Sequence, residues 1–190
     1  KGWRRALPEA SLNILMAARD SADILFTRQQ VEEALKAAAE RMALDVSDSN
    51  PLLIGIMNGA LVTLGHLVTY LDFPLELDYL HATRYDGEIS GCELQWIKEP
   101  RLSLIGRTIV LIDDILDEGI TLKEVVDYCY AAGAKQVKTF VLAEKDRQRE
   151  LAIKADYTAL NVPNRYVFGF GMDYKGYWRN LDGIYAVAQS

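Results

Sequence analysis

The feature that most limits the fold is a continuously apolar run, Ile109-Val-Leu-Ile112, preceded by the β-branched Thr108 and followed at once by acidic residues. Such a run is typical of a central strand in a parallel sheet, which is covered on both faces. A helical pattern follows, with apolar residues at positions i, i+3, i+4 and i+7: Leu122, Val125, Val126 and Cys129. Gly133 is a natural residue to end that helix. This order of strand, loop and helix predicts an α/β unit.

Similar units are expected on both sides of it. Two further helices are predicted at residues 29–44 and 60–71, the first opened by the capping box Thr27-x-x-Gln30. The strands are expected at residues 52–57, 75–83 and 137–143. Strands that alternate with helices in this way predict an α/β fold with a doubly wound, mainly parallel sheet.

The pattern changes near Asp156, where aromatic residues are interspersed with Gly and Pro. A chain of 190 residues fits one domain. We therefore expect a single domain over residues 1–190. Its core would comprise about residues 25–150, and a small hood lobe would be formed by residues 1–24 and 151–190.

Charge and composition exclude several classes of protein. The formal net charge is −6, from 21 Lys and Arg against 27 Asp and Glu, so a nucleic-acid partner is not expected. The longest apolar runs are too short to span a bilayer, so no membrane partner is expected either. With only Cys92 and Cys129, a disulfide framework is not expected, and a reducing cytoplasm is the simplest location.

The loop after the 108–112 strand has the residues needed to hold a sugar phosphate. Asp113 and Asp114 lie at the carboxyl end of the strand, where α/β sheets bind ligands and where carboxylates can accept hydrogen bonds from ribose hydroxyls. Glu118 to Thr121 lead into a helix N-terminus, whose unpaired N–H groups attract anions. Gly119 lets the backbone approach a phosphate closely. One loop therefore offers carboxylates for a ribose and amides for its phosphate.

Three other interpretations of this loop are open from the residues alone. Thr121 and Glu124 match a capping box, so Thr121 could serve only its own helix. Acidic residues after a strand are also common in solvated loops. The Asp-Asp-x-x-Asp spacing of residues 113–117 is used to bind magnesium diphosphates in isoprenoid enzymes. Those sites belong to all-helical folds, whereas here the preceding run is β-branched and Gly119 interrupts any helix.

Residues 110–121, Val-Leu-Ile-Asp-Asp-Ile-Leu-Asp-Glu-Gly-Ile-Thr, resemble the signature of the type I phosphoribosyltransferases, most closely the hypoxanthine-guanine phosphoribosyltransferases. The resemblance implies transfer of ribose 5-phosphate from phosphoribosyl pyrophosphate to a 6-oxopurine in purine salvage, with Mg²⁺ as cofactor. It also implies a homodimer or homotetramer. The same fold could instead carry a non-catalytic regulator that senses the donor, or a phosphoribosyltransferase for another base.

The signature implies a role for each polar residue of the loop. Asp113 and Asp114 would hold the ribose hydroxyls, and Asp117 would act as the general base at purine N7. Four residues would cradle the 5-phosphate, namely Glu118, Gly119, Ile120 and Thr121.

Two later segments, residues 140–145 and 163–174, resemble the parts of the family that bind the base. They imply that Lys145 donates to the exocyclic O6, that Tyr166 stacks on the base and that Val167 contacts it through its backbone. They also imply that Asp173 is a metal ligand and that the following Arg179 binds pyrophosphate. From the residues alone, Lys145 could be a surface cation, Tyr166 a core residue of the lobe, and Arg179 a partner for a nearby carboxylate.

Two positions depart from the family. Its pyrophosphate loop usually reads Leu-Lys-Gly-Gly, and here residues 57–60 read Met-Asn-Gly-Ala, so Asn58 replaces the lysine while Gly59 is retained. The resemblance implies that this loop can adopt a cis peptide and bind pyrophosphate through Asn58 and Gly59. Glu118 replaces a small residue of the phosphate cradle. Both changes would weaken binding of the donor.

Residues 84–100 contain Gly87, Gly91 and several charges without a sustained period, which predicts a long mobile loop or a loose hairpin. Arg84 and Tyr85 lie where the family begins a flexible lid. We therefore expect residues 84–96 to close over the substrates and shield a reactive sugar from water.

Overall fold

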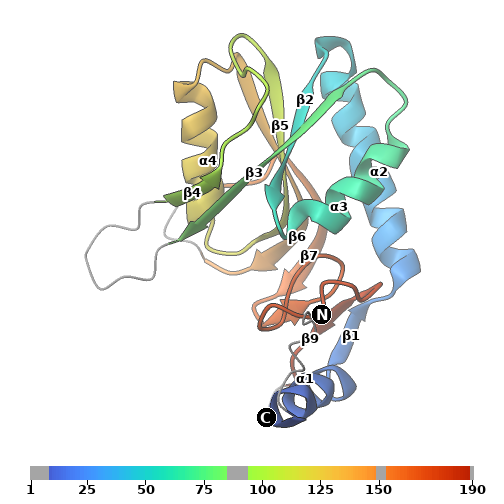
Figure 1. Cartoon of the computed structure of the whole chain (residues 1–190). Coiled ribbons are helices and arrows are strands. Elements are labelled where there is room, and N and C mark those ends of the chain that lie inside the picture. Colours follow the sequence, from blue (N-terminus) through green and yellow to red (C-terminus); the bar gives the residue numbers. More distant parts are fainter. Residues whose placement is uncertain (1–8, 85–93, 149–152, 189–190) are drawn as a thin grey trace, which may run out of the picture.

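The computed structural model describes residues 9–84, 94–148 and 153–188, which form a six-stranded sheet and a smaller three-stranded sheet (Figure 1). The larger sheet has the strand order β4-β3-β2-β5-β6-β7. Its strands are β2 (Leu52–Met57), β3 (Glu76–Arg84), β4 (Leu94–Lys98), β5 (Thr108–Leu116), β6 (Gln136–Asp146) and β7 (Tyr157–Pro163). The helices are α1 (Glu9–Asp20), α2 (Arg28–Val46), α3 (Ala60–Leu67) and α4 (Ile120–Ala131).

The large sheet is parallel except for the edge strand β4, which pairs antiparallel with β3. β5 lies between β2 and β6, with Leu52 opposite Ile109 on one side and Thr108 opposite Gln136 on the other. This position gives the apolar run of β5 two neighbouring strands and two covered faces. The predicted doubly wound, mainly parallel sheet is confirmed.

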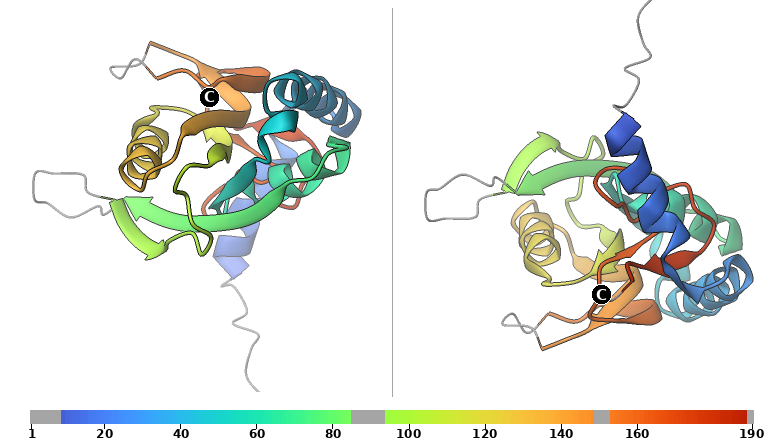
Figure 2. Two further views of the ribbon diagram at one scale, coloured as in Figure 1. Left: turned by 90° about the horizontal axis from the view of Figure 1, so that it is seen from above. Right: turned by 90° about the horizontal axis from the view of Figure 1, so that it is seen from below.

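α2 and α3 cover one face of this sheet, and α4 covers the other (Figures 1 and 2). Val110 and Ile112 of β5 are fully buried in a cluster with residues of α2 and α3. Ile109 and Leu111 point the other way, into a cluster with residues of α4. Cys129 belongs to the α4 side, and burial raises the pKa of its thiol to about 12. It is therefore a core residue, as its place on the apolar stripe of the helix predicted.

Local sequence signals account for several helix boundaries. Thr27 caps α2 through a complete capping box with Gln30, as predicted. α3 is shorter than the predicted 60–71 helix, because its last part continues as the 3₁₀ turn Val68–Tyr70. Among the described residues, no helix is both long and apolar enough to cross a bilayer.

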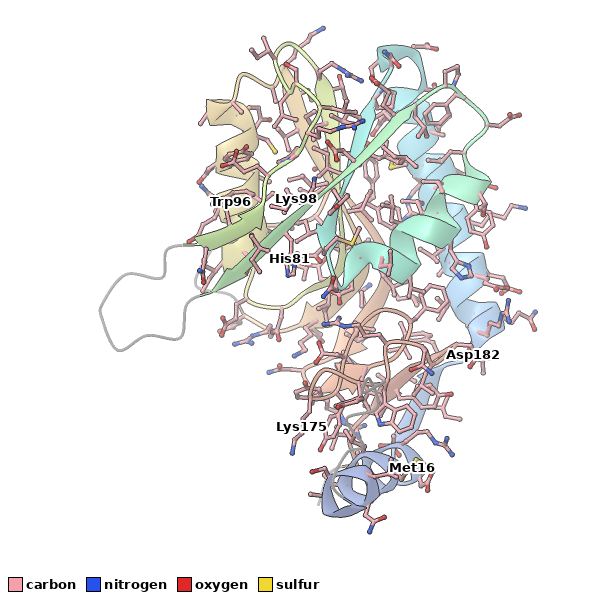
Figure 3. All side chains as sticks on the ribbon, viewed as in Figure 1. Met16, His81, Trp96, Lys98, Lys175 and Asp182 are labelled. Atoms are coloured by element: carbon pink, nitrogen blue, oxygen red, sulfur yellow. The ribbon has the colours of Figure 1, made fainter. Side chains whose placement is uncertain are left out.

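The segment expected as a loop at 84–100 contains a strand. β4 forms a hairpin with β3, and Trp96 packs on Tyr128 of α4 with their ring centroids 4.3 Å apart (Figure 3). The hairpin alternative was therefore the right one for residues 94–98. Tyr85 and most of the expected lid lie outside the described residues, and only the backbone of Arg84 is described, at the end of β3.

The small sheet has the order β1-β9-β8 and joins the two ends of the chain. Its strands are β1 (Asp23–Phe26), β8 (Val167–Phe168) and β9 (Ile184–Ala186). Trp178 Nε1 donates to the carbonyl of Leu15 at 2.9 Å, so α1 packs on the same lobe. β7 lies after the expected boundary near residue 150, yet it pairs parallel with β6 in the large sheet, and its Tyr157 and Val162 are buried in the core.

Candidate active site

A cavity of about 460 Å³ lies where the carboxyl ends of β2, β5 and β6 meet the segment that carries β8. Thirteen residues expected from the sequence line it: Asn58, Gly59, Asp113, Asp114, Asp117, Glu118, Gly119, Thr121, Lys145, Tyr166, Val167, Asp173 and Arg179. Six lining residues were not expected: Ile56, Met57, Ile115, Leu116, Leu122 and Met172. Of the four residues expected to cradle the phosphate, Ile120 is the one that does not line the cavity. The apolar residues escaped sequence analysis because they look like ordinary core.

The loop between β5 and α4 has the geometry of an anion site. Gly119 occupies the N-cap position with φ +83°, in the left-handed region that favours glycine, and no side chain caps the helix there. Ile153 packs against the Cα of Gly119, which leaves no room for a Cβ. Thr121 lies inside the first turn of α4, so its interpretation as the helix cap is wrong. The first turn of α4 therefore presents backbone N–H groups that no N-cap side chain satisfies.

Asp113 and Asp114 form a desolvated pair at the edge of this loop. The amide of Asp114 donates to Asp113 Oδ1 at 2.9 Å. Burial, together with the neighbouring charge of Asp114, raises the pKa of Asp113 well above its usual range. Burial also raises the pKa of Asp114, although the charge of Arg179 opposes that shift. The ionised forms of two carboxyl groups held this way are stabilised by any ligand that brings hydroxyl donors or cations.

The loop between β2 and α3 packs directly on this pair. The peptide between Met57 and Asn58 is cis, as the family resemblance implied. The Cα of Gly59 lies against the carboxylate of Asp114, so that any Cβ would collide with it. On its other side, Gly171 lies against the carbonyl oxygen of Gly59 and has φ +103°. The loop is therefore held between a carboxylate and the backbone of the C-terminal segment.

Arg179 links the acidic residues of the cavity. Its guanidinium lies 2.7 Å from Asp173 and 3.7 Å from Asp114, and it donates to the carbonyl of Gly171 at 2.6 Å. The carboxylate of Asp173 also accepts from the amide of Gly176 at 2.7 Å. The interpretation of Arg179 as a partner for nearby carboxylates therefore holds for this structure. Its position on the cavity wall also leaves it within reach of a bound anion.

Asp117 is held by two cations from the end of β6. Lys145 Nζ lies 2.5 Å from its Oδ2, and Arg147 Nη1 lies 2.7 Å from its Oδ1. Burial alone would raise the pKa of Asp117, but these two ion pairs outweigh it and lower the pKa. Lys145 lies inside β6 rather than just past it, because that strand continues three residues beyond the predicted end at residue 143.

Sequence analysis missed Arg147 as a residue of the site. Arg147 follows the last residue of β6, and its amide donates to the carbonyl of Lys145 at 3.0 Å, so the alternation of side chains along a strand does not place it. Its ion pair with Asp117 joins residues 30 positions apart, which no local pattern in the sequence reports.

One wall of the cavity comes from the C-terminal segment. Tyr166 is 51% exposed, so it is not the core residue that one interpretation allowed. Its ring meets Tyr174 edge-on with centroids 5.5 Å apart. Val167 next to it is buried and paired with β9, which fixes the backbone at this point. The wall therefore has an accessible aromatic ring beside a rigid strand.

Comparison with known proteins identifies the family. Residues 21–175 match the family model described as "Phosphoribosyl transferase domain". The chain belongs to the phosphoribosyltransferase family. Its resemblance to the family signature, inferred from residues 110–121, is confirmed.

Individual relatives in this family cover most of the chain. It is 32% identical over 170 residues to a hypoxanthine-guanine phosphoribosyltransferase of Bacillus subtilis, which is 89% of this chain and 94% of that protein. It is 34% identical over 166 residues to the bifunctional protein TilS/HprT of Listeria innocua. The chain spans about a quarter of that longer relative, since the match covers 26% of it. A mutant hypoxanthine phosphoribosyltransferase from Trypanosoma cruzi is similar in structure, with a TM-score of 0.83 and 26% identity over 89% of this chain and 97% of that one.

Proposed function

We propose that this phosphoribosyltransferase transfers ribose 5-phosphate from phosphoribosyl pyrophosphate to hypoxanthine or guanine, releasing pyrophosphate and forming IMP or GMP. The observation that carries the proposal is the pair of Lys145 and Asp117, 2.5 Å apart on the cavity wall. A 6-oxopurine presents an acceptor, O6, beside a donor, N7–H, on one edge. An ammonium beside a carboxylate matches that edge with a donor and an acceptor in the same order.

The other half of the base would meet the C-terminal wall. Tyr166 offers an exposed ring on which a purine can stack, and the backbone at Val167 would contact the far edge of the base. A pyrimidine lacks the five-membered ring that carries N7–H, so its N–H donor lies at a different spacing from its carbonyl oxygen. This mismatch favours a purine over the alternative of another base.

The donor would lie along the two loops at the strand ends. Asp113 and Asp114 would accept hydrogen bonds from the ribose hydroxyls, and the backbone amides of residues 118–121 would hold the 5-phosphate. Asn58, Gly59 and Arg179 would bind the pyrophosphate. Asn58 supplies no charge where the family has a lysine, so we expect weaker donor binding than in relatives that keep it.

The residues present fit Mg²⁺. Among the described residues, no group of three or more His, Cys, Asp or Glu side chains could hold a metal without help. Mg²⁺ commonly binds one or two carboxylates and completes its shell with water and substrate phosphates. Asp173 would supply a carboxylate, and Asp113 and Asp114 would hold the ribose hydroxyls close by. The ion would neutralise charge on the leaving pyrophosphate.

Catalysis by this chain would rest on positioning and charge. Asp117 would accept the N7 proton while the base attacks the anomeric carbon and the bond to pyrophosphate breaks. Lys145 would polarise O6, and the fixed dipoles of the loops would hold the sugar phosphate still.

We also infer from the family resemblance that the protein is a homodimer or homotetramer. Analytical ultracentrifugation measures this oligomeric state directly.

The test is a panel of bases. Purified protein, Mg²⁺ and phosphoribosyl pyrophosphate are mixed with hypoxanthine, guanine, xanthine, adenine, uracil or orotate, and pyrophosphate release is followed. We expect turnover with hypoxanthine or guanine and none without Mg²⁺. Donor binding without turnover on any base would favour a non-catalytic, donor-sensing regulator. Turnover confined to a pyrimidine would show that Lys145 and Asp117 have been assigned the wrong ligand.

A further inference from the structure

Arg147 contacts the proposed general base, although the reaction described above gives it no role. It directly follows β6, and its amide donates to the carbonyl of Lys145 at 3.0 Å. Its Nη1 lies 2.7 Å from Asp117 Oδ1, while Lys145 Nζ is 2.5 Å from Oδ2. Of the residues described, Lys145 lines the cavity and Arg147 does not. Each cation therefore holds a different oxygen of Asp117, and of the two only Lys145 lines the cavity.

This arrangement gives the two cations different roles toward Asp117 when a base binds. If Lys145 donates to the purine O6, it must give up part of its contact with Asp117 Oδ2. The Asp117 side chain is 37% exposed, so it has room to rotate away when that contact weakens. Arg147 lies outside the cavity and has no reason to leave Oδ1 when the base enters. Its planar guanidinium is also better suited than an ammonium to fix the direction of a carboxylate.

We propose that Arg147 is a positioning residue for the transfer reaction, which holds Asp117 in line with purine N7 while Lys145 moves to the exocyclic oxygen. The proposal rests on the function proposed above. The same contact helps to keep Asp117 ionised, as its lowered pKa indicates. A general base that is already ionised and oriented does not have to lose a proton or conformational freedom on the way to the transition state.

The first experiment separates turnover from binding. Arg147→Gln should lower kcat about ten- to hundredfold, less than the ~10²- to 10⁴-fold that a general base supplies in full. The KM for phosphoribosyl pyrophosphate should not change, because the ribose and phosphate loops are untouched. Arg147→Lys keeps the charge and should restore part of the loss.

Lys138→Gln is the matched control. Lys138 lies on β6, the strand that Arg147 directly follows, and it pairs with Asp156 at 2.9 Å; its side chain is 26% exposed, against 32% for Arg147. Its loss removes the same charge and a similar ion pair far from the cavity lining. Its kcat should equal that of the wild type. An unchanged kcat in Arg147→Gln, or an equal fall in both variants, overturns the proposal.

A double-mutant cycle asks whether Arg147 acts through Asp117. In an Asp117→Asn background, adding Arg147→Gln should cause no further fall in kcat, because there is no carboxylate left to position. Additive losses would place the action of Arg147 elsewhere and refute the inference.

An NMR titration of the Asp117 carboxyl carbon in the substrate-free protein gives a readout that does not need activity. The pKa of Asp117 should rise in Arg147→Gln and return toward the wild-type value in Arg147→Lys. If the wild type turns over no 6-oxopurine, the proposed function fails. If the wild type is active and the titration curves of the variants coincide with it, only the role of Arg147 fails.

Discussion

The contact between Gly59 and Asp114 leads to a sharp prediction for Gly59→Ala. The backbone at Gly59 is right-handed helical, with φ −59° and ψ −45°, so alanine fits without backbone strain. The added methyl group, however, would collide with the Asp114 carboxylate. The effect of this substitution should therefore come from displacing Asp114 alone.

The size of the effect follows from the geometry. The added methyl carbon would lie 2.1 Å from the nearest Asp114 oxygen, and ordinary contact needs about 3.5 Å, so Asp114 must retreat by roughly 1.4 Å. A misplacement of about 1 Å can cost on the order of 10²-fold in rate. We expect kcat/KM for phosphoribosyl pyrophosphate to fall by about that factor. The overpacking should also cost about 1–3 kcal/mol of stability.

Gly65→Ala provides the control within the same helix. A Cβ at Gly65 meets nothing within 4 Å, so alanine should stabilise α3 by about 1 kcal/mol and raise the melting temperature by roughly 2–4 °C. Its activity should match that of the wild type. The measurements are pyrophosphate release over a range of donor concentrations and thermal unfolding by circular dichroism. Wild-type kcat/KM in Gly59→Ala would refute the claim that this glycine positions Asp114.

Four further predictions follow from the site. Asp117→Asn should cut kcat about 10²- to 10⁴-fold with little change in donor affinity measured by calorimetry; lost affinity with an unchanged residual rate would mean that Asp117 is not the base. Asp113→Asn should raise the melting temperature, because it removes a buried carboxyl whose pKa is raised while its oxygen can still accept from the next amide. The unfolded state ionises at lower pH than the folded state, so the wild type loses stability as pH rises through that interval. The gain in Asp113→Asn should therefore grow from pH 4 to pH 7, and a pH-independent gain contradicts this. Gly171→Ala, at φ +103° and against the carbonyl of Gly59, should lower both stability and activity, as unfolding and turnover assays measure. Asp173→Asn should raise the Mg²⁺ concentration needed for half-maximal turnover, and an unchanged requirement would exclude Asp173 as a ligand.

Much of this fold follows from short-range signals in the sequence. Residues 52–57 were expected as a strand and form β2 with those bounds, because a buried parallel strand is apolar throughout. The capping box at Thr27 placed the start of α2 to within one residue. Where an element boundary differed from the prediction, a contact between segments distant in the sequence determined it. β5 and β6 run past their apolar parts because each provides the other with backbone partners up to the pairing of Leu116 with Glu144.

The site was predictable in part for a similar reason. Asp113, Asp114 and Gly119 form a local motif, so their spacing alone pointed to a sugar-phosphate loop. Arg147 and the glycine contact between residues 59 and 171 depend on segments far apart in the chain, and no local pattern reports them. The apolar lining residues were hidden because a core position and a cavity wall require the same side chains.

The meeting of Gly59 and Gly171 limits how this protein can vary. Most crowded positions in a core can be relieved by trimming the neighbour, so that a larger residue on one side is tolerated after a smaller one appears on the other. Here a Cβ at Gly171 would meet the backbone carbonyl oxygen of Gly59, an atom that every residue type carries. No substitution at position 59 can therefore make room for a side chain at position 171. Mutational libraries should leave Gly171 unchanged, whereas crowding at Gly59 comes from the Asp114 side chain and could be relieved by a smaller residue there.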